Sequence, residues 1–346
     1  MSEKNLPITI PPIIGYTIHA YPLSVIFNYN ETLPWFLSNY IQLVCDTRCK
    51  GIFFDFSVLS CILEGNKWID SVYPGNPWIK RNSIQFYLLR DYNIEINDFI
   101  INSINNNNYV VLHLDEYYIP DTRSYKIRTF YHENLVYGYD LKAKTYNVLG
   151  YNGKGIFGNM RIGFDTFEKG FNSNLSSWPN GQIKLISYNE EYSYELDLVL
   201  IRDQLTDFLN SQHTDNNYRT FRNPSQNCVY GLAVYDGLIE YFSLLSERKV
   251  YYDIRPLHII WEHKKCMLLR MEYLLKLYPS TKLEEIYKQY QLVEKKCMIM
   301  RQYQMKYSMS NKPELLDDII STLKMVCEYE RNILSDFILI INTLIK

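Results

Sequence analysis

The residue with the clearest chemical potential is a histidine at the start of an expected strand. His132 opens an apolar and aromatic run that reaches Tyr139, and a second run extends from Thr145 to Tyr151 after a polar turn. The two runs predict a β-hairpin. A histidine in this position can act as a general base when an amide or a carboxylate fixes its tautomer. Asn152 follows the second run and could supply that amide; the alternative is that His132 is a buried strand histidine bonded to a backbone carbonyl.

A nucleophilic thiolate is best stabilised at the start of a helix, where free N–H groups and the helix dipole favour negative charge. The segment from Gly15 to Ser24 predicts such a helix start, but it carries His19 and Ala20 and no cysteine. Alanine cannot act as a nucleophile, and Ser24, one helical turn further on, is the nearest hydroxyl. Cys228 is another candidate, because it follows a polar loop and is expected to open a helix; a buried structural cysteine is the alternative there.

Three segments together resemble the N-terminal domain of the butirosin biosynthesis protein H family. They are Gly15 to Ser24, Tyr109 to Pro120 ("YVVLHLDEYYIP") and His132 to Asp140 ("HENLVYGYD"), with a weaker match from Tyr230 to Asp236. The resemblance covers about residues 1 to 245. It implies an α+β architecture, namely a papain-like cysteine-protease fold with an antiparallel sheet, followed by a C-terminal helical domain.

The resemblance also implies acyl transfer. An acyl group leaves a carrier-protein thioester, rests on a cysteine and passes to an amine, as in antibiotic and other nonribosomal peptide-like biosynthesis. The chain is therefore expected to be an acyl or aminoacyl transferase or an amide synthase. Expected partners are an acyl or peptidyl carrier protein, which brings its own phosphopantetheine, and a small amine acceptor. One alternative is a catalytically silent papain-like protein that binds a carrier protein or a peptide-like product; another is a cysteine peptidase, which would need a nucleophile.

Site residues follow from the same resemblance. The expected catalytic positions are His132, Ala20 (the place of the expected cysteine), Asn152 and Ser24, and the expected substrate-binding positions are His19, Asp115 and Tyr118. Alternatives exist for two of them: His19 positions the helix start, and Asp115 bonds a loop. No metal site and no cofactor of the chain's own is expected.

Three accounts of Ala20 remain open. It is an engineered replacement of a cysteine, it marks a natural subfamily that has lost catalysis and only binds, or another nucleophile such as Ser24 serves instead.

The elements that would position these residues fall into two regions. Residues 1–250 predict the papain-like domain, including strands from Gln182 to Ser187 and from Tyr192 to Leu198 and a helix from Val229 to Leu245. Residues 251–346 predict an antiparallel helical bundle of three long amphipathic helices. The first of them has its apolar stripe at Ile260, Met267, Met271, Leu274 and Tyr278.

Composition excludes several classes of function. The net charge of −2 over 346 residues gives no field that would attract a phosphate backbone, so nucleic-acid binding is not expected. The seven cysteines are an odd number, which favours reduced thiols over a disulfide framework. Cys45 and Cys49 lack a second pair of ligands for zinc. Without a signal peptide or a long apolar span in the sequence, a cytoplasmic protein with no membrane contact is expected.

Overall fold

A computed structural model describes residues 2–46, 52–58, 63–64, 67–68, 75–177, 181–213 and 228–345. The chain forms two compact units, one made of Met1–Asn30 and Asn76–Tyr192 and the other of Glu31–Gly75 and Ser193–Lys346. The chain therefore leaves the first unit, contributes residues 31–75 to the second, and then returns. The domain boundary expected at residue 250 lies inside the second unit and stays a prediction.

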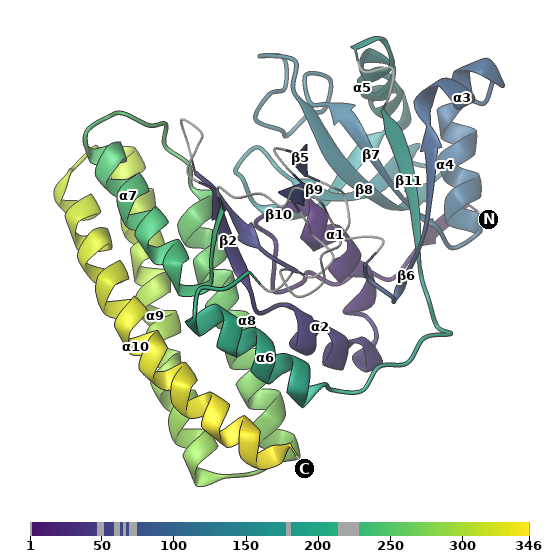
Figure 1. Ribbon diagram of the computed structural model, residues 1–346. Helices are drawn as coiled ribbons and strands as arrows, with labels where there is room; N and C mark the ends of the chain where they lie inside the picture. Colours follow the sequence, from purple (N-terminus) through teal and green to yellow (C-terminus); the bar gives the residue numbers. More distant parts are fainter. Residues whose placement is uncertain are drawn as a thin grey trace. The chain divides into compact units, whose positions relative to one another are not determined.

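The first unit is built on an antiparallel sheet, with seven strands among the residues described (Figure 1). The strands follow the order β10 (Phe157–Gly163), β9 (Thr145–Tyr151), β8 (Tyr131–Asp140), β7 (Tyr109–Asp115), β11 (Gln182–Tyr188) and β6 (Ile79–Gln85), and β1 (Glu3–Asn5) pairs with β8. The predicted hairpin is confirmed as β8 and β9.

The end of β8 is shaped by a bulge and a glycine. The β8–β9 register shifts between Val136 and Gly138, so β8 bends there. A Cβ atom on Gly138 would lie 2.7 Å from the carbonyl oxygen of Lys4. Only glycine therefore lets β1 approach β8 closely enough to pair with it.

Helices of the first unit pack on this sheet. They are α1 (Thr17–Ile26), α3 (Phe86–Asp91), α4 (Ile96–Asn105) and α5 (Phe164–Ser177). Tyr146 of β9 anchors two of them, because its hydroxyl donates to Asn97 Oδ1 of α4 at 2.7 Å while its ring contacts Phe164 and Phe167 of α5. Helix α5 continues to Ser177.

The second unit combines a small sheet with a helical region. The antiparallel strands β12 (Cys228–Tyr230), β2 (Leu43–Asp46) and β3 (Phe53–Phe56) pair in that order, and β4 (Leu63–Glu64) pairs with β5 (Lys67–Trp68). The helices are α2 (Leu33–Asn39), α6 (Leu198–Leu209), α7 (Val234–Ser246), α8 (Arg255–Leu277), α9 (Thr281–Ser310) and α10 (Glu314–Leu344). One-turn 3-10 helices also occur, η1 (Asn30–Thr32) and η3 (Gly231–Ala233).

The C-terminal helical region predicted by periodicity is confirmed as α8, α9 and α10, which run side by side in Figure 1. Met267, Met271 and Leu274 of the predicted stripe are fully buried. Asn311 ends α9 in the left-handed conformation, with φ 53°, and thereby turns the chain toward α10. None of the helices described combines the length and apolarity that a bilayer crossing requires.

Charged side chains interrupt the apolar core of these helices. Lys264 of α8 and Glu330 of α10 are both fully buried, and Lys264 Nζ lies 2.7 and 2.8 Å from the two carboxylate oxygens. Tyr235 and Tyr290 donate hydroxyl hydrogens to the same carboxylate, and His263 Nδ1 lies 3.0 Å from Lys264 Nζ. Both charges are thus paired and hydrogen-bonded, which a buried ion pair requires.

A second buried cation fastens α8 to α2. Arg270 Nε donates to the carbonyl oxygen of Leu37 at 2.7 Å, and its terminal nitrogen donates to that of Tyr40 at 2.8 Å. Burial lowers the pKa of Arg270 to about 10, so the guanidinium remains charged at neutral pH. Its donors bind carbonyl groups at the C-terminal end of α2, where its charge also interacts favourably with the helix dipole.

Two expectations from the sequence are wrong. Tyr192 to Leu198 form no strand; residues 192–197 are irregular, and Asp197 caps α6 by accepting a hydrogen bond from the Leu200 N–H at 2.8 Å. Cys228 does not open a helix. It begins β12 opposite Asp46 of β2, and the helix α7 starts only at Val234.

Candidate functional site

His132 is held by a carboxylate that lies at the end of the neighbouring strand. Its Nδ1 is 3.0 Å from Glu116 Oε1, and the two side chains are 28% and 9% exposed. An ionised carboxylate can only accept, so Nδ1 carries the hydrogen of this bond and Nε2 keeps its lone pair in the neutral ring. The imidazole is therefore oriented from a buried side while remaining in reach of solvent.

Strand pairing sets this geometry. His132 lies opposite Leu114 in the β7–β8 ladder, and Glu116 follows directly after the end of β7. The Glu116 N–H donates to the carbonyl oxygen of Phe130 at 2.9 Å, which extends the pairing beyond the ladder. The rings of Phe130 and Tyr151 flank the imidazole, with centroids at 5.7 and 6.1 Å.

Asn152 does not hold the imidazole. Its Oδ1 accepts hydrogen bonds from the N–H groups of Lys154 and Ile156, both at 3.0 Å, and so closes the turn between β9 and β10. The role expected of Asn152, fixing the tautomer of His132, falls to Glu116 in this structure. A carboxylate also stabilises the protonated imidazole, which an amide cannot do to the same extent.

Asp115 braces the loop that follows β7. Its carboxylate is buried and accepts from the N–H groups of Phe130 at 3.0 Å and Tyr117 at 3.1 Å, while the Ser173 hydroxyl donates to its other oxygen at 2.9 Å. These bonds match the loop-bracing alternative. Tyr118 lies in the same loop, where its N–H donates to the Asp115 carbonyl oxygen at 3.1 Å.

The expected site residues of α1 have no access to solvent. His19, Ala20 and Ser24 are all fully buried. The Ser24 hydroxyl donates to the carbonyl oxygen of Ala20 at 2.6 Å, within its own helix. Across the described residues, no hydrogen bond or ion pair joins His132 to α1, so the predicted site residues are not all brought together.

Tyr21, which the sequence did not single out, connects α1 to the strand that bears His132. Its buried hydroxyl donates to the carbonyl oxygen of Glu133 at 2.6 Å, one residue after His132. Gly150 of β9 leaves room beside this bond, since a Cβ there would lie 3.1 Å from Asn134 Oδ1 and 3.8 Å from the Tyr21 hydroxyl. The N-terminal helix is therefore fixed next to the histidine through the residue that follows Ala20.

A second histidine lies in the same sheet. His113 of β7 is opposite Glu133 of β8, whose carboxylate is 3.1 Å from Lys184 Nζ. Burial lowers the pKa of His113, and nearby Lys184 acts in the same direction while Glu133 acts against them. His113 is therefore neutral at pH 7.

The thiols and the acidic groups give no metal centre in the part of the chain that the structure describes. Burial raises the pKa of Cys45 to about 12, and Cys228 nearby adds to that shift, so Cys45 is a neutral thiol. Cys49 and Cys61 lie outside the described residues.

No protein-family model matches this chain, and no curated protein matches it. The resemblance to the butirosin biosynthesis protein H family thus depends on the segments quoted above.

Proposed function

We propose that the chain is a papain-like acyl or aminoacyl transferase, or amide synthase, in which His132 is the general base. Its substrates would be an acyl group on the phosphopantetheine of an acyl or peptidyl carrier protein and a small amine acceptor. The observation that carries the proposal is the contact between His132 Nδ1 and Glu116, which leaves Nε2 available to take a proton.

Transfer would be direct, because Ala20 offers no nucleophile and the Ser24 hydroxyl donates into its own helix. The amine nitrogen attacks the thioester carbonyl carbon while His132 Nε2 takes a proton from that nitrogen. The carbon–sulfur bond then breaks, and the leaving thiolate receives the proton from the imidazolium. Glu116 stabilises the imidazolium in between, as the carboxylate of a catalytic triad does.

The test is an amide-forming assay with an acyl-loaded carrier protein and an amine, read by mass spectrometry of the product. His132→Gln is expected to lower the rate by about 10²- to 10⁴-fold, the usual contribution of general base catalysis. His258→Gln is the matched control, since His258 also pairs with a buried carboxylate, that of Glu262 at 3.1 Å, but belongs to the second unit. Equal losses in both variants would contradict the assigned base.

A binding protein without catalysis is the second candidate, and the full burial of Ala20 favours it. Ala20→Cys distinguishes the two. An acyl adduct that forms only on this variant, and that disappears with His132→Ala, would mark position 20 as a lost or replaced nucleophile. Measurable carrier binding with neither adduct nor amide product in any variant would support the silent protein. Thermal melting of each variant checks that the buried substitution leaves the unit folded.

A further inference from the structure

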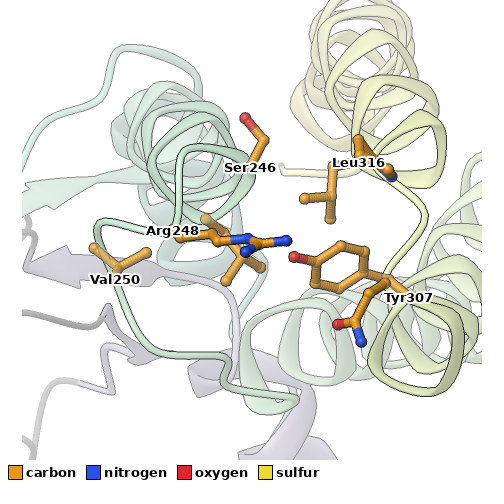
Figure 2. A pocket seen from close by; sticks show the side chains of 8 residues that line it. Ser246, Arg248, Val250, Tyr307 and Leu316 are labelled. Carbon is orange, nitrogen blue, oxygen red and sulfur yellow. The ribbon is translucent and has the colours of Figure 1, made fainter.

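A pocket of about 440 Å³ lies in the second unit, where α7 and α9 end and α10 begins. This volume is within the usual range for small-molecule sites. Figure 2 shows the Arg248 side chain and the Tyr307 ring pointing toward one another, with Ser246 and Leu316 above them in this view. The lining residues are Leu245, Ser246, Arg248, Val250, Tyr307, Asn311, Pro313 and Leu316.

Arg248 is the one charged residue in this lining. Its neighbours in sequence are paired, since Lys249 Nζ lies 2.5 Å from Glu247. The guanidinium of Arg248, in contrast, has no hydrogen bond or ion pair to any residue that the structure describes; only its backbone N–H is bonded, to the Leu245 carbonyl oxygen at 3.0 Å. A planar fork of five donors is thus available to a ligand.

Two further polar groups are available beside it. The side chains of Tyr307 and Asn311 have no hydrogen-bond partner within the described parts of the chain. Leu245 and Leu316 are buried and give the pocket an apolar wall. One cation, two neutral polar groups and an apolar wall favour a ligand with a single negative charge and a short hydrocarbon part.

The backbone at Arg248 adds an independent point. Arg248 has φ 60°, the left-handed conformation in which α-helices usually place glycine. The Lys249 N–H donates to the Leu244 carbonyl oxygen at 2.9 Å, which completes the helix-ending motif around it. Glycine would satisfy this backbone at lower cost, so the fold alone does not require arginine here.

We propose that this pocket binds a small carboxylate with a short apolar chain, with its carboxylate on the Arg248 guanidinium and the Tyr307 hydroxyl and its chain against Leu245 and Leu316. The inference is independent of the proposed acyl transfer. A guanidinium–carboxylate pair of this kind is bidentate and charge-assisted.

The probe is hexanoate, titrated into the full chain and followed by calorimetry and by saturation-transfer NMR. We expect binding of hexanoate, with acetate and hexylamine both weaker by about tenfold or more, since each lacks one of the two recognised parts. Arg248→Gly should weaken hexanoate binding at least about tenfold, because a charged hydrogen bond is lost. This variant suits the left-handed backbone, so it should remain folded.

Lys249→Gln is the matched control, because it removes an adjacent exposed charge without touching the pocket lining. Unchanged affinity in Lys249→Gln together with the loss in Arg248→Gly supports the site. The proposal is overturned if hexanoate fails to bind at millimolar concentration, or if both variants bind as the wild type does. Equal affinity for acetate and hexanoate would overturn the apolar half of the site.

Discussion

His132–Glu116 and Lys264–Glu330 are both ionisable pairs, and they differ in access. In the first unit, the imidazole is 28% exposed, and within the described residues only one of its nitrogens is bonded to another side chain. In the second unit, both partners are fully buried, and two tyrosine hydroxyls and His263 complete the cluster. The first pair has an open position for a proton, whereas the second has its hydrogen-bonding groups directed at one another.

The difference separates a group that can react from one that organises a core. A general base needs a partner that orients it and a second side that substrate can reach. A buried ion pair without access has mainly the effect of selecting one packing arrangement of its helices, since the Coulomb attraction is offset by desolvation. The strength of a charge pair is therefore a poor guide to function. A better guide is whether the pair has a hydrogen-bonding position that a substrate can reach.

The largest expected effect is a loss of stability at the fully buried pair, Lys264–Glu330. Glu330→Gln should lower the free energy of unfolding by about 3–5 kcal/mol, because Lys264 is left buried without its opposite charge. Urea denaturation followed by circular dichroism measures this. The double variant Lys264→Met, Glu330→Leu should lose less than the single one. A single variant with wild-type stability would show that the cluster is accessible to water.

The partly exposed pair, His132–Glu116, should show the opposite balance, with a large effect on activity and a small one on stability. Glu116→Gln should lower the rate of acyl transfer by about 10- to 100-fold, because the imidazolium loses its stabilising anion. Its free energy of unfolding should change by only about 1 kcal/mol, since a half-open pair contributes little. A loss of stability as large as that of Glu330→Gln, without any effect on transfer, would remove the distinction between the two pairs.

Acid should lower the stability of the second unit through His263, which belongs to the buried cluster around Lys264 and Glu330. Burial and the nearby Lys264 and Arg270 lower the pKa of His263 well below its ordinary value, against the hydrogen bond to the Ile41 carbonyl oxygen, which acts to raise it. The unfolded chain therefore binds a proton near pH 6.5 that the folded protein does not, and stability falls as the pH drops below that value. The slope is at most about 1.4 kcal/mol per pH unit for this group.

The measurement is urea denaturation at several pH values between 7.5 and 5. His263→Gln should lose this part of the slope, although its stability at pH 7.5 will be lower because the bond to the Ile41 carbonyl oxygen, 2.7 Å in length, is altered. An identical slope in the variant and the wild type would mean that His263 reaches its charged form without unfolding.

The smallest effect is expected at Ser24. Ser24→Ala removes a hydrogen bond to the Ala20 carbonyl oxygen inside α1 and should cost about 1 kcal/mol or less. Acyl transfer should be unchanged, because this hydroxyl is fully buried. A transfer rate that falls as steeply as in His132→Gln would restore Ser24 as a nucleophile.

Local patterns predicted the elements of this fold better than its charged contacts. The β8–β9 hairpin and the three long helices follow from alternation and helical periodicity. The alternation from Tyr192 to Leu198 wrongly predicted a strand. No strand lies beside this segment in the described residues, and Asp197 caps the start of a helix instead. Glu116 was missed since its contact with His132 crosses two strands, and nothing in the local sequence marks it.

The sequence does contain a signal for the fully buried pair, Lys264–Glu330. The apolar stripe advances by seven from Ile260 to Met267 and again from Val326 to Ile333. The skipped positions are Lys264 and Glu330, so the gaps in both stripes mark charges on the buried face. Opposite charges in two such gaps predict an ion pair between helices, whereas their tyrosine partners come from elsewhere in the chain and require the tertiary structure.

The interleaved division of the chain sets an order for folding during synthesis. The strands β2 and β3 emerge from the ribosome early, but β12, which pairs with β2, begins at residue 228 and α8, which packs on β3, at residue 255. At about 5–20 residues per second, these strands wait on the order of ten seconds or longer for their partners. During that interval their apolar edges are open to other nascent chains, so a slower ribosome would be expected to increase aggregation of this protein.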